Sequence, residues 1–304
     1  MLKKKMMKLL QVVVSVVLLI IVLRKIDVVN LFSSMTRVPL WFVLVSLFLT
    51  LFSTLVISVR WSLLLLPKIT VKNILIFSKA TFIGRFYSLF LSSSMGGDLV
   101  KWLPLMKRYP ELSKIKLASS VLLDRIIGFT AFVIVAFVSM IVGMAIKLDF
   151  PLCIFWIFSG LFVGVLLFYM CVFMFDFEKI FRYLRVPNKI IEMAEILTKT
   201  EKNRLFKSFA ISIVTAPIWS FTGWLAFLAF DTGIPVLATM IIMPIINLIL
   251  ILPVSVAGFG AREGLFVYFF SNFAVSNESI LASSAFAGVL GVVFSLVGGV
   301  LTLF

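Results

Sequence analysis

Long apolar runs separated by short polar stretches dominate the hydropathy pattern of this chain. A helix that crosses a bilayer needs about 20 apolar residues. Runs of this kind predict membrane helices over residues 9–23, 39–66, 118–145, 150–175, 209–230 and 280–304. The first run is short and follows four lysines, as in a signal peptide. Because Arg24 and Lys25 follow it in place of a small-residue cleavage site, we interpret it as a retained first helix.

Two further apolar runs, 74–91 and 236–252, are interrupted and lead into glycine-rich polar motifs. The motifs are Ser94-Met-Gly96-Gly97-Asp98 and Pro253-Val-Ser255-Val-Ala-Gly258-Phe-Gly260-Ala-Arg262-Glu263. Irregular backbone at membrane depth is tolerated only where protein or a water-filled cavity surrounds it, and charges there are typical of functional sites. The alternative is an ordinary interfacial loop. Arg60 and Trp61 near the end of 39–66 are typical of the membrane interface, and we expect both there.

The interrupted runs, the motifs and the spans that follow them recur at nearly the same spacing in the two halves of the chain. This pattern predicts an all-α polytopic membrane protein with a single transmembrane domain over residues 1–304, built from repeats 1–147 and 148–304. Each repeat is expected to hold about three transmembrane helices and one re-entrant segment. Because an odd number of spans ends on the opposite side of the membrane from where it began, we expect the two repeats to have inverted orientations in the membrane. The alternative is eight full spans with parallel halves. In transporters such interrupted segments line the binding site.

Charge orients this arrangement in the membrane. The chain is 62% hydrophobic and carries a net charge of +15, concentrated in loops 101–116 and 179–207. Basic loops are typical of the cytoplasmic side, so we expect both loops and the N-terminus there, in a cell (inner) membrane. One loop does not fit this orientation, because its basic residues Arg24, Lys25 and Arg37 would lie outside. Residues 176–207 show helical apolar periodicity among their charges, which predicts amphipathic helices on the membrane surface.

Several function classes are excluded or disfavoured by the residues present. The chain has no histidine, so histidine-metal sites and Ser-His triads are excluded. Its two cysteines, Cys153 and Cys171, lie in one apolar run and indicate packing rather than a metal site. No catalytic motif, cofactor motif or nucleic-acid-binding pattern interrupts the apolar runs. We therefore expect a protein that is not an enzyme, has no cofactor and binds no nucleic acid.

Three segments resemble the family named for the transmembrane region of lysylphosphatidylglycerol synthase, a family of flippase-like membrane proteins. They are the first motif through Lys101, the segment Ser120-Val-Leu-Leu-Asp124-Arg125, and the second motif. The resemblance covers nearly the whole chain and implies lipid translocation, or handling of a lipid-linked substrate. Ser92, Lys101 and Ala257 depart from the family pattern, which has proline, arginine and glycine there. Lysine acts as a point charge, so Lys101 lacks the planar fork with which an arginine binds phosphate bidentately.

These features predict a polar cavity that binds an anionic phospholipid or a polyprenyl-phosphate-linked lipid. Cations and backbone N–H groups would replace the water of a phosphate, and acids would pair the cations when the site is empty. The expected substrate-binding residues are Arg85, Ser94, Gly96, Gly97, Asp98, Lys101, Asp124, Arg125, Ser255, Gly258, Gly260, Arg262 and Glu263. We expect a half-helix starting near Gly264, and Glu263 paired with Arg125 across the two halves.

Two other functions compete with a lipid flippase or transporter. One is an intramembrane lipid-linked glycosyl or phosphoryl transferase, which the lack of an Asp-x-Asp motif or acidic cluster disfavours. The other is a non-catalytic scaffold for a lipid synthase, which the basic surface loops would permit. The expected partners are therefore membrane lipids, with lipid-biosynthesis enzymes as the second choice. The sequence names neither the lipid, the energy source nor the oligomeric state.

Overall fold

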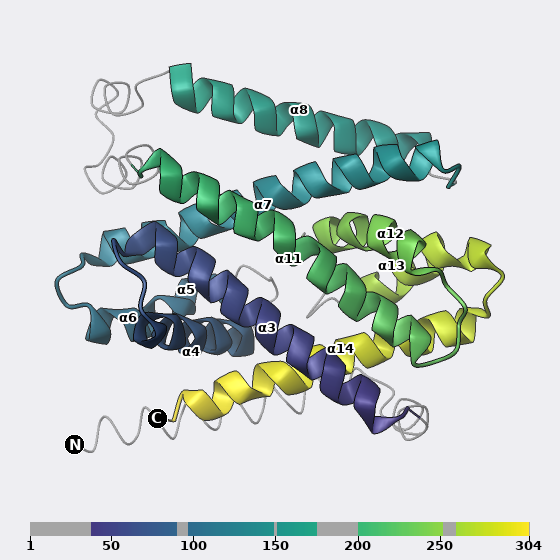
Figure 1. The fold of residues 1–304 in the computed structure, drawn as a ribbon, viewed down its shortest axis with the longest axis horizontal. Coiled ribbons are helices and arrows are strands. Elements are labelled where there is room, and N and C mark those ends of the chain that lie inside the picture. Colours follow the sequence, from purple (N-terminus) through teal and green to yellow (C-terminus); the bar gives the residue numbers. More distant parts are fainter. Residues whose placement is uncertain (1–37, 90–96, 149–150, 175–199, 252–259, 304) are drawn as a thin grey trace.

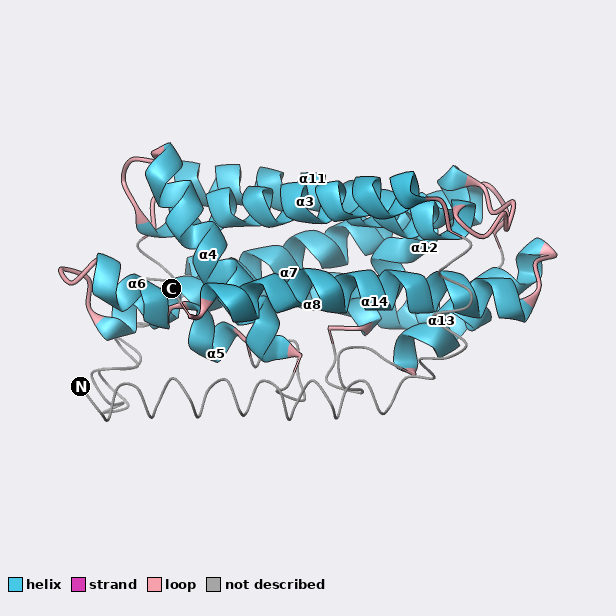
Figure 2. Cartoon of the chain, turned by 90° about the horizontal axis from the view of Figure 1, so that it is seen from below, coloured by secondary structure: helices cyan, strands magenta, loops and turns pink. Residues whose placement is uncertain are grey.

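The structure is a computed structural model that describes residues 38–89, 97–148, 151–174, 200–251 and 260–303. These residues form helices and no strand (Figures 1 and 2). The helices are α3 (Leu40–Leu65), α4 (Val71–Ser88), α5 (Asp98–Lys101), α6 (Leu103–Arg108), α7 (Lys114–Ala145), α8 (Leu152–Met174), α11 (Lys202–Leu228), α12 (Val236–Ile249), α13 (Ala261–Phe270), the 3₁₀ turn η2 (Ser271–Phe273) and α14 (Asn277–Leu301). The predicted all-α fold is confirmed.

Five of the described helices are long and apolar enough to cross a membrane: α3, α7, α8, α11 and α14. The predicted span 9–23 and most of the predicted surface segment 176–207 lie outside the described residues. Residues 202–207 belong to α11, which therefore begins before the predicted span 209–230. A helix extends past the hydrocarbon core with its basic residues at the interface, so apolarity alone places its start too late.

The interrupted run 74–91 corresponds to α4, which has 18 residues, and the run 236–252 to α12, which has 14. In Figure 1, α4 begins at the end of the molecule where α3 stops and runs to the middle, and α6 lies back at that end. At the opposite end, α12 runs inward and α13 turns back toward the start of α14. The inner ends of α4 and α12 therefore both lie deep in the bundle.

Hydroxyl side chains at several helix N-termini accept backbone hydrogen bonds and set where the helices start. The Thr70 side chain accepts from the Asn73 N–H at α4, Ser113 from Lys116 at α7, and Ser276 from Ser279 at α14. Each bond satisfies one of the N–H groups left open in a first turn.

The two halves of the chain pack together along their length. Helix α3 contacts α11, α7 contacts α12, and α4 contacts α14. The approach of α14 to α4 is close, because a β-carbon added at Gly298 would collide with the Phe82 carbonyl of α4. Small residues allow helices in a membrane to approach in this way. The interior between α3, α4, α7, α11 and α14 is thus enclosed by both halves.

Candidate functional site

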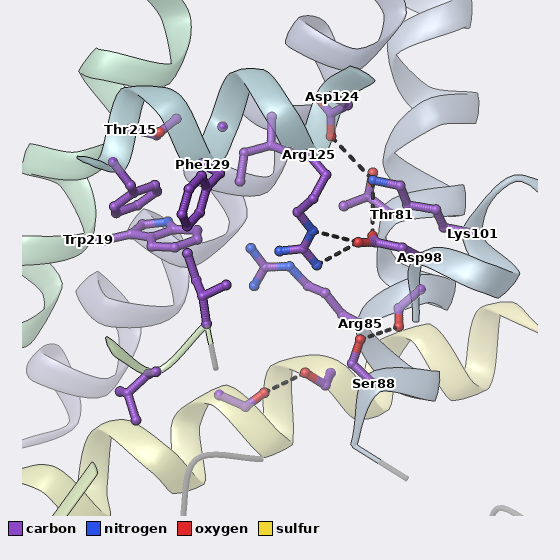
Figure 3. Close-up of a pocket in the computed structure, with 18 of the residues that line it drawn as sticks. Thr81, Arg85, Ser88, Asp98, Lys101, Asp124, Arg125, Phe129, Thr215 and Trp219 are labelled. Atoms are coloured by element: carbon purple, nitrogen blue, oxygen red, sulfur yellow. Dashed lines mark hydrogen bonds and ion pairs between the residues drawn. The ribbon is translucent and has the colours of Figure 1, made fainter. Parts of the chain in front are cut away.

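A cavity of about 450 Å³ lies where the inner ends of α4 and α5 meet α7, α11 and the start of α13 (Figure 3). Its size is that of a small-molecule or head-group site. Six of the predicted substrate-binding residues line it: Arg85, Asp98, Lys101, Asp124, Arg125 and Arg262. Arg60 also lines it, so five cations and two carboxylates face one cavity.

Ion pairs of alternating sign connect three helices on one side of the cavity. Arg60 Nε lies 2.7 Å from one oxygen of Asp124, and Lys101 Nζ lies 3.3 Å from the other. Lys101 Nζ is also 3.2 Å from Asp98, whose second oxygen is 2.6 Å from Arg125 Nη2. Figure 3 shows the Lys101, Asp98 and Arg125 members of this set pointing toward one another. We call these five residues the ion-pair chain, and we infer that it holds Asp98 and Lys101 of α5 against α7.

Arg60 is the member of the ion-pair chain that the sequence did not predict to be in the site. It was expected at the membrane interface, but it is only 7% exposed and also donates from Nη1 to Ser212 Oγ of α11 at 3.0 Å. Gly128 makes room for it, since a β-carbon there would lie 3.0 Å from Arg60 Nη1. The sequence does contain one indication that Arg60 faces the protein interior. Ser46, Ser53 and Arg60 are polar residues at seven-residue spacing, which places them on one face of α3, and all three are buried.

Trp61 is also buried inside the protein, so its ring packs against protein and not against lipid. It is 0% exposed, and its indole N–H donates to Ser120 Oγ at 3.0 Å. Lys101 Nζ lies 4.7 Å from the centre of its ring. A cation over an indole face is an attractive contact, so Trp61 supports the ammonium group that links Asp98 to Asp124.

Two glycines place α5 beside α4. A β-carbon added at Gly97 would collide with the Gly84 carbonyl, and one added at Gly84 would lie 2.7 Å from Lys101 Cβ. Close packing here fixes the first turn of α5, and with it Asp98 and Lys101. The missing side chain of Gly97 therefore lets α5 pack closely against α4, and Gly97 itself does not line the cavity. Ser94, Gly96, Ser255 and Gly258, the other motif residues predicted to bind, lie outside the described residues.

Arg85 and Arg262 bring further positive charge from opposite ends of the molecule. Arg85 comes from the last turn of α4, and its guanidinium lies 5.7 Å from the ring centre of Phe294 on α14. In Figure 3 this guanidinium lies beside that of Arg125, inside the cavity. Arg262 reaches the same cavity from the first turn of α13, in the other half of the chain. Cations from both halves of the chain therefore line one cavity.

Glu263 does not pair with Arg125, and that prediction is wrong. Its carboxylate accepts from the backbone N–H of Gly260 at 2.5 Å and from Ser284 Oγ of α14 at 3.2 Å. Gly260 has φ of 82°, a conformation that favours glycine, and α13 starts at Ala261 rather than near Gly264. Glu263 thus caps its own helix and fastens it to α14, because an acid three residues into a helix can reach back to the N-cap. Neither Gly260 nor Glu263 lines the cavity.

A bundle of apolar helices around a buried cationic cavity defines a multi-pass membrane protein whose interior site suits an anion. Within the described part of the chain, no group of three or more His, Cys, Asp or Glu side chains is placed to hold a metal ion.

The chain belongs to the family described as the lysylphosphatidylglycerol synthase TM region, which it matches over residues 8–299. Membership associates it with membrane lipid metabolism or transport. No curated protein and no solved structure matches the chain.

Proposed function

We propose that this protein binds the phosphate-bearing head group of an anionic membrane lipid in the cavity and carries it across the membrane. The proposal is supported by the charge of the cavity: among the described residues that line it, five are cations, Arg60, Arg85, Lys101, Arg125 and Arg262, and two are carboxylates, Asp98 and Asp124. Charges far from water are costly unless they are compensated. An anion that enters the cavity would supply the missing negative charge.

Arg85 and Arg125 are the residues we propose for direct contact with the phosphate. Their guanidinium groups lie side by side and point into the open part of the cavity (Figure 3). Guanidinium groups bind phosphate through paired hydrogen bonds, which lysine does not do. Lys101 is already enclosed by Asp98, Asp124 and Trp61, so we assign it to positioning. This assignment fits lysine in place of the arginine usual in the family.

The positions of α4–α6 and α12–α13 support transport rather than binding alone. Each group enters from one end of the molecule and returns toward it, as re-entrant segments do (Figure 1). Their inner ends meet the cavity, so small movements of either group would change access from one end only. This is the arrangement expected for alternating access between inverted repeats.

The charge of the two ends suggests the orientation. The end that holds α6 and the start of α7 carries Lys107, Arg108, Lys114 and Lys116, whereas Asp231 and Glu278 lie at the other end. Basic residues gather on the cytoplasmic side of membrane proteins. We therefore propose that the α6 end faces the cytoplasm in a cell (inner) membrane.

The binding step is tested by measuring lipid affinity in nanodiscs with Arg85→Ala and Arg125→Ala variants. A hydrogen bond to a charged group contributes about 1.5–3 kcal/mol, so each variant should bind phosphatidylglycerol roughly ten- to a hundredfold more weakly. Arg108→Ala, which removes an exposed arginine from α6, is the matched control and should bind as the parent does. Parent-like affinity in both cavity variants would overturn the site.

A further inference from the structure

The cavity has a second end that the proposed phosphate contacts do not occupy. Asp98 and Lys101 lie at one side in Figure 3, whereas Phe129 and Trp219 lie at the other, and the guanidinium groups of Arg85 and Arg125 lie between them. A lipid phosphate bound by these two arginines would direct the rest of its head group toward one side or the other. The chemistry of the aromatic end therefore bears on the identity of the head group.

Aromatic faces form the wall at this end. Phe129 and Phe132 come from α7, one and two turns beyond Arg125, and Trp219 comes from α11. The Phe132 and Trp219 rings lie 5.3 Å apart between centres and tilt by 39°. All three side chains line the cavity. They offer ring faces to a ligand a short distance from the phosphate position.

Polar groups on α11 accompany these rings. Thr215 and Trp219 are four residues apart, so they lie on one face of the helix, and both line the cavity. The Thr215 hydroxyl donates to the Ser212 carbonyl at 2.6 Å, which leaves its oxygen able to accept. Among the residues that the structure describes, Trp61 and Trp224 donate their indole N–H to Ser120 and Ile234, whereas Trp219 has no such acceptor. The aromatic end thus offers a ring face, a donor and an acceptor together.

This combination discriminates among head groups. An ammonium group such as choline is disfavoured, because cations outnumber carboxylates by three among the described residues that line the cavity. A hydrocarbon chain would meet the ring faces but would leave the indole N–H and the threonine oxygen without partners. A hydroxylated ring matches all three features, since its C–H face packs on an aromatic ring and its hydroxyls both donate and accept.

We propose that the cavity selects lipids whose phosphate carries a hydroxylated ring, a sugar or a cyclitol, with the ring against Trp219 and Phe129. This inference rests on the proposed function and narrows its substrate class. The phosphate lies on Arg85 and Arg125, the Trp219 N–H donates to a ring hydroxyl, and another ring hydroxyl donates to Thr215. A volume of about 450 Å³ suits a head group of this kind.

The test compares two probe lipids that have the same net charge and the same acyl chains, dioleoyl phosphatidylinositol and dioleoyl phosphatidylglycerol. Their affinities are measured in nanodiscs of dioleoyl phosphatidylcholine, for the parent and for Trp219→Leu and Trp219→Phe. One packed aromatic face and one hydrogen bond give roughly tenfold tighter binding of the inositol lipid by the parent. Trp219→Phe keeps the ring face and loses the donor, so its preference should fall to about threefold.

Trp219→Leu should bring the two affinities to within about twofold of each other by weakening only the inositol lipid. Trp41→Leu is the matched control, because Trp41 is 51% exposed on α3 and does not line the cavity. It should keep the tenfold preference. If the parent binds both anionic lipids equally, or if Trp219→Leu weakens both equally, the ring assignment is wrong. If neither binds more tightly than phosphatidylcholine, the proposed function itself fails.

Discussion

The ion-pair chain makes a quantitative prediction about folding stability. Arg60→Met removes the guanidinium but keeps much of the side-chain volume, and it leaves Asp124, which is 2% exposed, with Lys101 alone. Removing one partner of a buried ion pair costs about 3–5 kcal/mol. Because Lys101 still neutralises Asp124, we expect the lower end of this range, about 3 kcal/mol.

A double-mutant cycle separates the ion pair from the loss of packing. Asp124→Leu should also cost about 3 kcal/mol, since among the described residues it leaves the buried Arg60 side chain with the Ser212 hydroxyl as its hydrogen-bond partner. In the double variant neither charge remains buried without its partner, while Lys101 keeps Asp98 at 3.2 Å. The loss of unfolding free energy in the double variant should therefore be about 2 kcal/mol smaller than the sum of the losses in the two single variants.

The assay is the free energy of unfolding in mixed micelles, measured by titration with a denaturing detergent. The control cycle uses Arg204 and Glu201, which pair at 2.9 Å at the start of α11, where Glu201 is exposed and Arg204 is partly exposed. Exposed pairs contribute about 0–1 kcal/mol, so this control should show little coupling. Additive effects of Arg60→Met and Asp124→Leu, to within about 0.5 kcal/mol, would refute the view that the buried pair organises the site.

Three further predictions follow from particular contacts. Gly97→Ala should displace α5 from Gly84 and weaken phosphatidylglycerol binding in nanodiscs at least tenfold, whereas Gly160→Ala on α8, where a β-carbon meets no atom within 4 Å, should not. Glu263→Gln should lower stability by about 1 kcal/mol through a weaker cap while leaving lipid affinity within about twofold of the parent, and a tenfold loss of affinity would place Glu263 in the binding site. In a variant without native cysteines, cysteines at Glu111 and Asp231 should be labelled by a membrane-impermeant reagent from opposite sides, the first only from the cytoplasm; labelling of both from one side would exclude the orientation.

Much of the fold could be predicted from the sequence because membrane burial leaves a strong local signal. The apolar runs mark α3, α7, α8, α11 and α14, and the short interrupted runs mark α4 and α12. Helix ends were less predictable. The start of α13 depends on the backbone of Gly260 and on a hydrogen bond from its N–H to Glu263, neither of which alters hydropathy.

The candidate site was predicted where its residues carry charge within motifs. Asp98, Lys101, Asp124 and Arg125 form two short charged groups in apolar surroundings, and the structure brings them together. Arg60 was missed because an arginine and a tryptophan near a helix end are typical of the interface. Its partner Asp124 lies 64 positions away, and its partner Ser212 lies 152 positions away. Pairings over such separations depend on how α3 packs against α7 and α11.

The most direct test of the account is lipid movement in proteoliposomes. The measurement follows fluorescently labelled phosphatidylglycerol from the inner to the outer leaflet, with labelled phosphatidylcholine as the neutral comparison. We predict that the parent accelerates movement of the anionic lipid over that of phosphatidylcholine, and that the variant with both Arg85→Ala and Arg125→Ala loses this acceleration while remaining folded. Equal movement of the two lipids by the parent, or undiminished movement of the anionic lipid by the double variant, would contradict the claim that this cationic cavity carries anionic head groups.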